Sequence, residues 1–134
     1  MAHAEGRYRS LPFSQQRVRE YVVSTLGNSP IRCLFVACVG SRVIGLAGAY
    51  IDDYLFCDLQ VACDSVVFVH PHYRGTTTGK RLISALASWA VERGAHELCL
   101  SISSGINPVR TGRLYERLGF APIGHLYRRT LGSA

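Results

Sequence analysis

Apolar side chains recur at helical spacing in three segments of this chain. The segments run from about Phe13 to Leu26, from Thr78 to Arg93 and from Thr111 to Leu118, and a glycine follows each of them. Ser14 is a residue type that caps helices, and glycine commonly ends them. The pattern predicts three amphipathic helices. The faces expected to be buried consist of Val18, Tyr21, Val22 and Leu26 in the first helix and of Leu82, Ile83, Leu86, Ala87 and Ala90 in the second.

Shorter apolar or alternating runs predict strands between these helices. Cys33–Val39 and Arg42–Tyr50 are separated only by the turn residues Gly40 and Ser41, which indicates an antiparallel hairpin. The segment Asp52–Asp58 is either a loop or a continuation of the second strand. Three further strands are expected at Ala62–Val69, Glu97–Ser103 and Ile123–Leu131.

The order helix, three strands, helix, strand, helix, strand predicts a mixed α/β fold. Ala62–Val69, the long helix and Glu97–Ser103 form a β-α-β unit, whose two strands are expected to be parallel. With 134 residues, the chain is long enough for one compact domain, residues 1–134, and not for two.

The charge of the chain indicates an anionic partner. The net charge is +6 at pH 7, and Lys80 is the only lysine among the 15 basic residues. The aspartates, by contrast, all lie between Asp52 and Asp64. This acidic segment suggests that the protein binds an anion and a cation at different places.

The five cysteines are odd in number and include no C-x-x-C pair, which argues against a disulfide framework and a zinc knuckle. We expect them to be reduced and mostly buried. No apolar run approaches the roughly 20 residues of a membrane helix, and the first residues lack the apolar core of a signal peptide. A cytoplasmic protein is therefore the simplest expectation. His70 and His72 have no evident third ligand, so no metal site is predicted.

One turn, P-H-Y-R-G-T-T-T-G-K-R-L from Pro71 to Leu82, lies between a predicted strand and the long helix. The first backbone N–H groups of a helix have no intrahelical partner, and the helix dipole adds positive potential there. Gly75 and Gly79 allow an anion to approach the backbone, and the threonines between them offer hydroxyl groups. The turn therefore predicts a site for a phosphate or pyrophosphate.

Two common phosphate-binding motifs do not fit this turn. A P-loop requires G-x-x-x-x-G-K-[ST], but here the glycines are one residue too close and Arg81 stands where Ser or Thr is needed. The dinucleotide pattern G-x-G-x-x-G is absent. A third possibility is the pyrophosphate loop of coenzyme A-dependent acetyltransferases.

The stretch V-F-V-H-P-H-Y-R-G-T-T-T-G-K-R-L-I resembles the loop motif of the GNAT family of N-acetyltransferases, Q/R-x-x-G-x-G/A at the start of a helix. Arg74 matches its first position and Gly79 its last, while Thr77 replaces the middle glycine. A second block, N-P-V-R-T-G-R-L-Y-E-R-L-G-F, resembles the other motif of the family, with Asn107 and Tyr115 at functional positions.

The resemblance covers roughly Cys33 to Gly124 and implies both a fold and an activity. The fold is a mixed, mostly antiparallel sheet with a β-α-β cofactor-binding core and helices on both faces. The activity is the transfer of an acetyl group from acetyl-CoA to a primary amine within a ternary complex. The implied cofactor-binding residues are Phe68, Val69, His70, Arg74, Gly75, Thr76, Thr77, Thr78, Gly79, Lys80, Arg81, Asn107 and Tyr115.

The resemblance also implies catalytic roles. Tyr115 would be the general acid that protonates the departing thiolate. Asp64 is the first candidate for the base that deprotonates the amine, because it lies on the strand that leads to the thioester, and Asp58 is the second. The acidic segment suggests a cationic acceptor, such as a polyamine, an aminoglycoside-like amine, or a lysine or N-terminus of a protein.

Two other classes of function stay open at this point. The chain could be an acetyltransferase-like module that binds a protein partner without catalysis. A nucleic-acid binder would explain the positive charge, but the arginines are spread along the chain without the aromatic interleaving of a stacking surface. We therefore expect no specific nucleic-acid partner and no membrane partner, while a homodimer is compatible with the family.

Overall fold

The computed structural model describes residues 2–27 and 29–132. The chain divides into two compact units, a central unit formed by Gln15–Leu100 and an end unit formed by the segments up to Ser14 and from Ser101 onward. The expectation of one domain over residues 1–134 stays a prediction.

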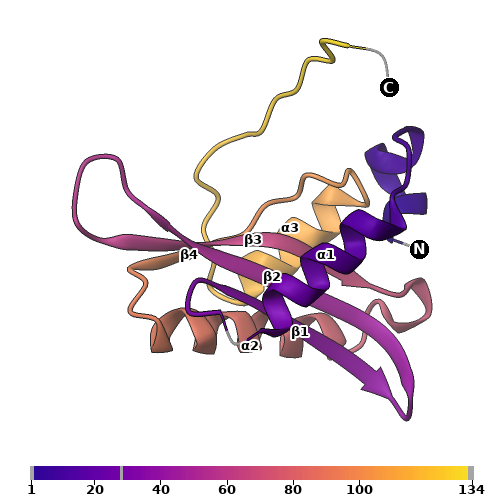
Figure 1. Ribbon diagram of the computed structural model, residues 1–134, viewed down its shortest axis with the longest axis horizontal. Helices are drawn as coiled ribbons and strands as arrows, with labels where there is room; N and C mark the ends of the chain where they lie inside the picture. Colours follow the sequence, from indigo (N-terminus) through magenta and orange to yellow (C-terminus); the bar gives the residue numbers. More distant parts are fainter. Residues whose placement is uncertain (1, 28, 133–134) are drawn as a thin grey trace. The chain divides into compact units, whose positions relative to one another are not determined.

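A four-stranded sheet forms the centre of the central unit (Figure 1). Its strands, in spatial order, are β1 (Arg32–Val39), β2 (Arg42–Asp53), β3 (Gln60–Val69) and β4 (Glu97–Cys99). The first two pairs are antiparallel and the β3–β4 pair is parallel. The predicted hairpin and the parallel β-α-β unit are therefore confirmed. The second strand continues through the first part of the segment that the sequence left open.

Helices α1 (Gln15–Leu26) and α2 (Thr78–Glu92) lie on opposite faces of this sheet (Figure 1). A Cβ atom added to Gly45 would meet Leu82 of α2, whereas one added to Gly48 would meet the Tyr21 hydroxyl of α1. Because side chains alternate between the two faces of a strand, residues three apart point in opposite directions. The predicted mixed, mostly antiparallel sheet with helices on both faces is thus confirmed.

The core of the central unit lies between α2 and the sheet. Ala47 and Ala62 are fully buried, and so is Leu86 opposite them on α2. Small side chains on β2 let the helix approach the sheet closely, so that large side chains on α2 fill the space between them. The buried residues of this core are Cys33, Ala47, Ala49, Ala62, Leu82, Leu86, Trp89 and Ala90.

The predicted buried face of α1 was only partly right. Val18 and Leu26 are largely exposed, and the buried residue of the helix is Thr25. The Thr25 hydroxyl donates hydrogen bonds to the carbonyl oxygens of Tyr21 and Val22, which satisfies it inside the helix. Residues 15–20 are all exposed, so the helix buries side chains only in its second half. The periodicity could not show where the helix leaves the sheet.

One predicted strand is shorter than expected and another is wrong. The run Glu97–Ser103 pairs as a strand only as far as Cys99. Beyond that point, the Ser104 carbonyl accepts a hydrogen bond from the Arg7 backbone N–H of the 3₁₀ helix η2 (Gly6–Ser10), so this backbone is used by the chain's own start. In the described part of the chain, Ile123–Leu131 forms no strand, because no neighbouring strand pairs with it.

The end unit contains one α-helix, α3 (Pro108–Arg117), which begins three residues earlier than the sequence pattern predicted. Asn107 caps it, because its side-chain oxygen accepts a hydrogen bond from the Arg110 backbone N–H at 3.4 Å. Proline follows at the first helical position, where a missing N–H costs nothing. Gly119 ends the helix with a φ of 93°, as its position in the sequence indicated.

The core packing predicts that α2 stabilises the fold through Leu86. Leu86→Ala removes a fully buried side chain and leaves a cavity, so we expect the free energy of unfolding to fall by about 2–5 kcal/mol. Val91→Ala, on the exposed side of the same helix, is the matched control and should change it by less than about 0.5 kcal/mol. Urea denaturation followed by circular dichroism measures both. Equal effects of the two substitutions would contradict this placement of the core.

Candidate functional site

The turn between β3 and α2 is a tight connection. The strand ends at Val69, a short 3₁₀ helix η3 covers Pro71–Tyr73, and α2 begins at Thr78. Gly75 has a φ of 83°, in the left-handed region that glycine adopts without strain. A side chain at this position would strain the turn, so the backbone requires a glycine here, although residue 75 is not one of the motif's glycine positions.

Backbone amides at the start of α2 are available to an anion. The Thr78 N–H donates to the Thr76 hydroxyl at 3.3 Å, and the Thr77 carbonyl accepts the first helical bond from the Arg81 N–H at 2.9 Å. Among the described residues, the N–H groups of Gly79 and Lys80 have no hydrogen-bond partner, as is usual in a first helical turn. Together with the helix dipole, they form a site that favours negative charge.

Gly45 on β2 sets the distance between this turn and the sheet. A Cβ atom at Gly45 would lie 3.0 Å from the Phe68 carbonyl oxygen and 3.1 Å from a methyl carbon of Leu82. The first turn of α2 therefore packs directly on the backbone of β2. The sequence offered no signal for this role, because an isolated glycine in a strand also marks a bulge or an edge.

Arg74 is held at the junction of strand and turn. Its Nε–H donates to the Val69 carbonyl at 2.9 Å, and its guanidinium carbon lies 5.4 Å from the centre of the Phe68 ring. The side chain is half-buried, and these two contacts hold its guanidinium group beside the turn instead of letting it extend into solvent. The matched motif residues from Arg74 to Arg81 thus lie on one connected stretch of backbone.

The second half of β3 has one side without a strand partner. Its ladder with β4 ends at the Cys63–Cys99 pair, although β3 continues to Val69. The His70 N–H donates to the Ile44 carbonyl of β2 at 2.8 Å. Backbone groups alternate in direction along a strand, so those of Val69 point away from β2, and its carbonyl accepts the Arg74 bond.

The same alternation identifies a further candidate for backbone binding of the ligand, which the sequence motif does not reveal. Phe68 and His70, both proposed from the sequence as backbone ligands, direct their main-chain groups toward β2. Val67 directs its N–H and carbonyl to the open side, where no strand pairs with it within the described chain. Only the register of the sheet shows this, because the motif letters do not encode the direction of an N–H group.

Asp64 lies on β3 opposite Ala49, where the ladder with β2 is irregular. The side chain is half-buried. Burial is the main cause of the raised pKa of the Cys63 and Cys99 thiols, and the Asp64 carboxylate adds to it. The carboxylate is therefore part of a mixed acidic and thiol-bearing region at the point where β3 and β4 cease to pair.

Tyr115 and Asn107 both belong to the end unit. The Tyr115 side chain is 7% exposed, and its hydroxyl donates a hydrogen bond to the Ser101 carbonyl oxygen at 3.4 Å. Its ring lies 6.0 Å from that of Phe120. Asn107 caps α3 from a left-handed conformation with a φ of 42°. The second sequence motif is thus the capped start and the buried face of a single helix.

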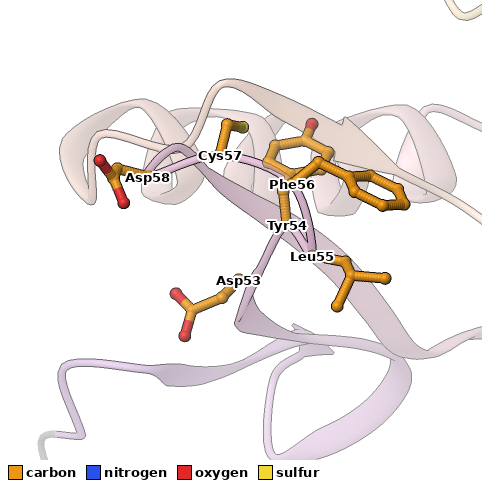
Figure 2. A pocket seen from close by; sticks show the side chains of 6 residues that line it. All are labelled: Asp53, Tyr54, Leu55, Phe56, Cys57 and Asp58. Carbon is orange, nitrogen blue, oxygen red and sulfur yellow. The ribbon is translucent and has the colours of Figure 1, made fainter.

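An acidic loop connects β2 and β3. Residues Asp53–Asp58 line an open concavity of about 610 Å³ (Figure 2). Leu55 and Phe56 project to one side of the loop, whereas the carboxylates of Asp53 and Asp58 lie toward the other (Figure 2). Both apolar side chains are almost fully exposed. The loop therefore presents apolar and negatively charged surfaces side by side.

Two hydrogen bonds tie this loop to the sheet. The Tyr54 hydroxyl donates to Glu97 of β4 at 2.5 Å, and the Gln60 amide donates to Asp53 at 2.8 Å. Because the bond to the carboxylate holds the phenol proton, it raises the pKa of Tyr54 to about 12. The tyrosine stays neutral throughout the physiological range and keeps the acidic loop against β4.

The cysteines are less buried than the sequence suggested. Only Cys33 is buried, while Cys38 and Cys57 are exposed. Burial is the main cause of the raised pKa of the thiols of Cys33, Cys63 and Cys99. A raised pKa keeps a thiol protonated and unreactive near neutral pH, so these three are poor nucleophiles.

His70 and His72 stack on each other rather than converging on a common point, with ring centres 5.3 Å apart. The His70 ring accepts a hydrogen bond from the His72 backbone N–H at 3.2 Å. In residues 2–27 and 29–132, no group of three or more His, Cys, Asp or Glu side chains is placed to hold a metal ion. Nor does any helix in that part of the chain have the length and apolar character needed to span a membrane.

Comparison with protein-family models gives one match, to the acetyltransferase (GNAT) domain over residues 30–122. The matched region contains the turn, the open half of β3 and the whole of α3. The chain belongs to the GNAT acetyltransferase family. The resemblance read from the two sequence motifs is therefore confirmed, and the mixed α/β fold is the fold of this family.

Solved structures give the same fold. An acetyltransferase from Trypanosoma brucei is 24% identical with a TM-score of 0.70, over 90% of this chain and 82% of that one. The aminoglycoside N-acetyltransferase AAC(6')-Iy, bound to a bisubstrate analogue, is 23% identical with a TM-score of 0.71, over 92% and 86%. Glucosamine-6-phosphate N-acetyltransferase from Arabidopsis thaliana is 14% identical with a TM-score of 0.74, over 91% and 82%. No curated protein sequence matches the chain.

Proposed function

We propose that this GNAT domain is an acetyl-CoA-dependent N-acetyltransferase that transfers the acetyl group to a primary amine by direct attack in a ternary complex. The observation that carries the proposal is the turn from Arg74 to Arg81, where unpartnered helix amides and basic side chains stand beside a strand with an open side. A pyrophosphate fits the turn, and an extended amide-containing arm fits the strand. Those are the two chemical halves of coenzyme A.

The turn would hold the pyrophosphate through main-chain groups. The free N–H groups of Gly79 and Lys80 point outward at the positive end of the helix dipole. Gly75 adopts the left-handed conformation that the turn needs, and it has no side chain that could obstruct the anion. Arg74, Lys80 and Arg81 add positive charge, and Thr77 adds a hydroxyl donor. The Thr76 hydroxyl instead donates to the Tyr73 carbonyl, and the Thr76 and Thr78 hydroxyl oxygens lie 3.0 Å apart, so these two side chains hold the turn together. The open side of β3, at both main-chain groups of Val67 and at the Val69 N–H, would pair with the amides of the pantetheine arm as an additional strand would.

The acceptor amine must lose a proton in order to attack. Asp64 is the residue proposed to take it, directly or through a water molecule, because it lies on β3 where that strand separates from β4. The nitrogen lone pair forms the new N–C bond, the C–S bond then breaks, and the nitrogen releases its second proton to solvent. Tyr115 is proposed to give its phenol proton to the leaving thiolate, which leaves the thiol of coenzyme A and an amide. Solvent then returns a proton to Tyr115.

The first test is ligand binding. Acetyl-CoA at about 100 times its Kd should add roughly 2.7 kcal/mol to the free energy of unfolding, which thermal unfolding detects as a higher Tm. The variants Gly79→Trp and Gly75→Ala should lose this shift, because one fills the anion site and the other strains the turn. Arg93→Ala removes a charge just beyond the opposite end of α2 and should keep it. If millimolar acetyl-CoA does not stabilise the wild type, the partner-binding alternative becomes the better explanation.

The catalytic roles predict two distinct kinetic defects. Tyr115→Phe should lower kcat roughly 100-fold with little change in the KM for acetyl-CoA, because it removes only the proton donor. Asp64→Asn should also lower kcat, but its defect should shrink as the pH rises, since more of the amine is then already neutral. Tyr127→Phe, an exposed tyrosine of the end unit, is the control. A Tyr115→Phe enzyme with the wild-type kcat would exclude this tyrosine as the acid.

We further propose that the acceptor is cationic. Asp52 and Asp53 are the last two residues of β2, and Asp58 lies in the acidic loop that follows. The net charge of the chain is +6, so this loop is a local exception that would attract a cation to one place. A polyamine, an aminoglycoside-like amine, and a lysine or N-terminus of a protein share this chemistry.

Charge removal tests the acceptor class. Asp53→Asn and Asp58→Asn should each raise the KM for a di- or polyamine several-fold while the KM for acetyl-CoA stays constant, because each removes one attractive charge. The increase should diminish at high salt, which screens exposed charges. Glu92→Gln, an exposed acid at the end of α2, is the matched control. An unchanged acceptor KM in the aspartate variants would disprove a role for the loop.

A further inference from the structure

Strand β3 contains a one-residue bulge at Ser65. Gly48 of β2 lies opposite Val66, and the next residue, Ala49, lies opposite Asp64. Ser65 is therefore an extra residue without a partner in the ladder. Bulges of this kind change the direction of a strand and shift the alternation of its side chains and backbone groups.

Two hydrogen bonds show that the shift occurs within β3. Before the bulge, the Gln60 carbonyl faces β4 and accepts a bond from the His96 N–H at 2.7 Å. After it, the His70 N–H faces β2 and donates to the Ile44 carbonyl at 2.8 Å. Gln60 and His70 are an even number of residues apart, so in a regular strand they would face the same side.

The consequence is a change in which amides face the open side. If the alternation ran unbroken through residue 65, Val66 and Phe68 would point their main-chain groups away from β2. Because Ser65 interrupts it, Val67 and Val69 do so instead. The bulge therefore decides which backbone groups could pair with an extended ligand beyond the last β3–β4 pair.

A hydrogen bond from helix α1 holds this bulge. The hydroxyl groups of Tyr21 and Ser65 lie 2.6 Å apart, although the two residues are distant in sequence. Gly48 makes room for them, because a Cβ atom there would lie 2.3 Å from the Tyr21 oxygen and 2.8 Å from the Ser65 oxygen. A hydroxyl pair, a bulge and a glycine thus fit together at one point of the sheet.

The helix itself supplies little other anchoring at this place. Half of α1 is exposed along all its sides, and Thr25 is its only buried residue among those described. The Tyr21–Ser65 bond is therefore a directional tie between α1 and β3, added to modest apolar packing. Removing one hydroxyl would free the bulge without removing any of the core side chains under α2.

We propose that Tyr21 is a positioning residue for the reaction: through Ser65 it fixes the bulge that aims the Val67 amide at the acyl-carrying arm of acetyl-CoA. The inference rests on the proposed function. The turn holds the pyrophosphate at one end of the open strand, so an arm that runs back along β3 reaches Val67 and then the bulge. Tyr21 touches neither part of the ligand and acts only through β3.

Paired ligands test this proposal. ADP 3′-phosphate would occupy the turn alone, whereas acetyl-CoA would also use the open strand. In Tyr21→Phe, calorimetry should show acetyl-CoA binding weakened roughly 5- to 10-fold, the size of one hydrogen bond of about 1 to 1.5 kcal/mol, with ADP 3′-phosphate binding unchanged. Ser65→Ala should have the same effect. The double variant should bind acetyl-CoA no more weakly than either single variant, because both substitutions remove the same hydrogen bond.

Three further variants sharpen the outcome. Ser65→Thr keeps a hydroxyl and should retain wild-type binding, while Gly48→Ala should mimic Tyr21→Phe by displacing the tyrosine oxygen. Ser24→Ala removes a hydroxyl that donates to the Tyr21 carbonyl within α1, and it should change the binding of neither ligand. Equal weakening of both ligands, or none, in Tyr21→Phe would overturn the positioning role. If the wild type binds neither ligand, the proposed function itself fails.

Discussion

The close packing of α2 on the central strands is the constraint on which the candidate site depends. Ala47 and Ala49 on β2 leave room for Leu82 and Leu86, and Gly45 lets the first turn of the helix rest on the sheet backbone. A helix held this closely has its N-terminus at a fixed place beside the end of β3. The free amides and the positive end of the dipole then converge on one small volume. Larger side chains on β2 would move the helix away and separate the anion site at its N-terminus from the open side of β3.

A second constraint acts on the strand rather than on the helix. The parallel ladder between β3 and β4 is only three residue pairs long, and it ends where the bulge at Ser65 begins. Backbone groups that a longer ladder would have used are left open. An unpaired strand side is normally a liability for a protein, because it invites other strands to pair. Here it lies next to an anion site, which makes an extended, phosphate-bearing ligand the natural partner.

The electrostatics of the central unit follow the same division. Basic side chains gather around the turn, where Arg74 is fixed by the Val69 carbonyl and the Phe68 ring. Acidic side chains gather at the other end of β3, where Tyr54 ties the loop to Glu97. A chain with a net charge of +6 therefore presents both signs, separated along one strand. This separation underlies the proposal that the cofactor is anionic and the acceptor amine cationic.

The sequence was sufficient wherever the determining interactions are local. The limits of α2, the β1–β2 hairpin and the turn around Gly75 follow from spacing, capping and the conformational freedom of glycine, all of which act between near neighbours. The two motifs also identified the family, because they preserve a phosphate-binding turn and a capped helix as continuous stretches.

The tertiary structure alone decided which segments of strand found partners. Glu97–Ser103 stops pairing at Cys99, and Ile123–Leu131 forms no strand within the described residues. Likewise, the roles of Val67, Gly45 and the Tyr21–Ser65 bond come from register and distance between residues far apart in the chain. Periodicity shows which side chains share a face, but hydrogen-bond partners and bulges depend on what lies across the sheet.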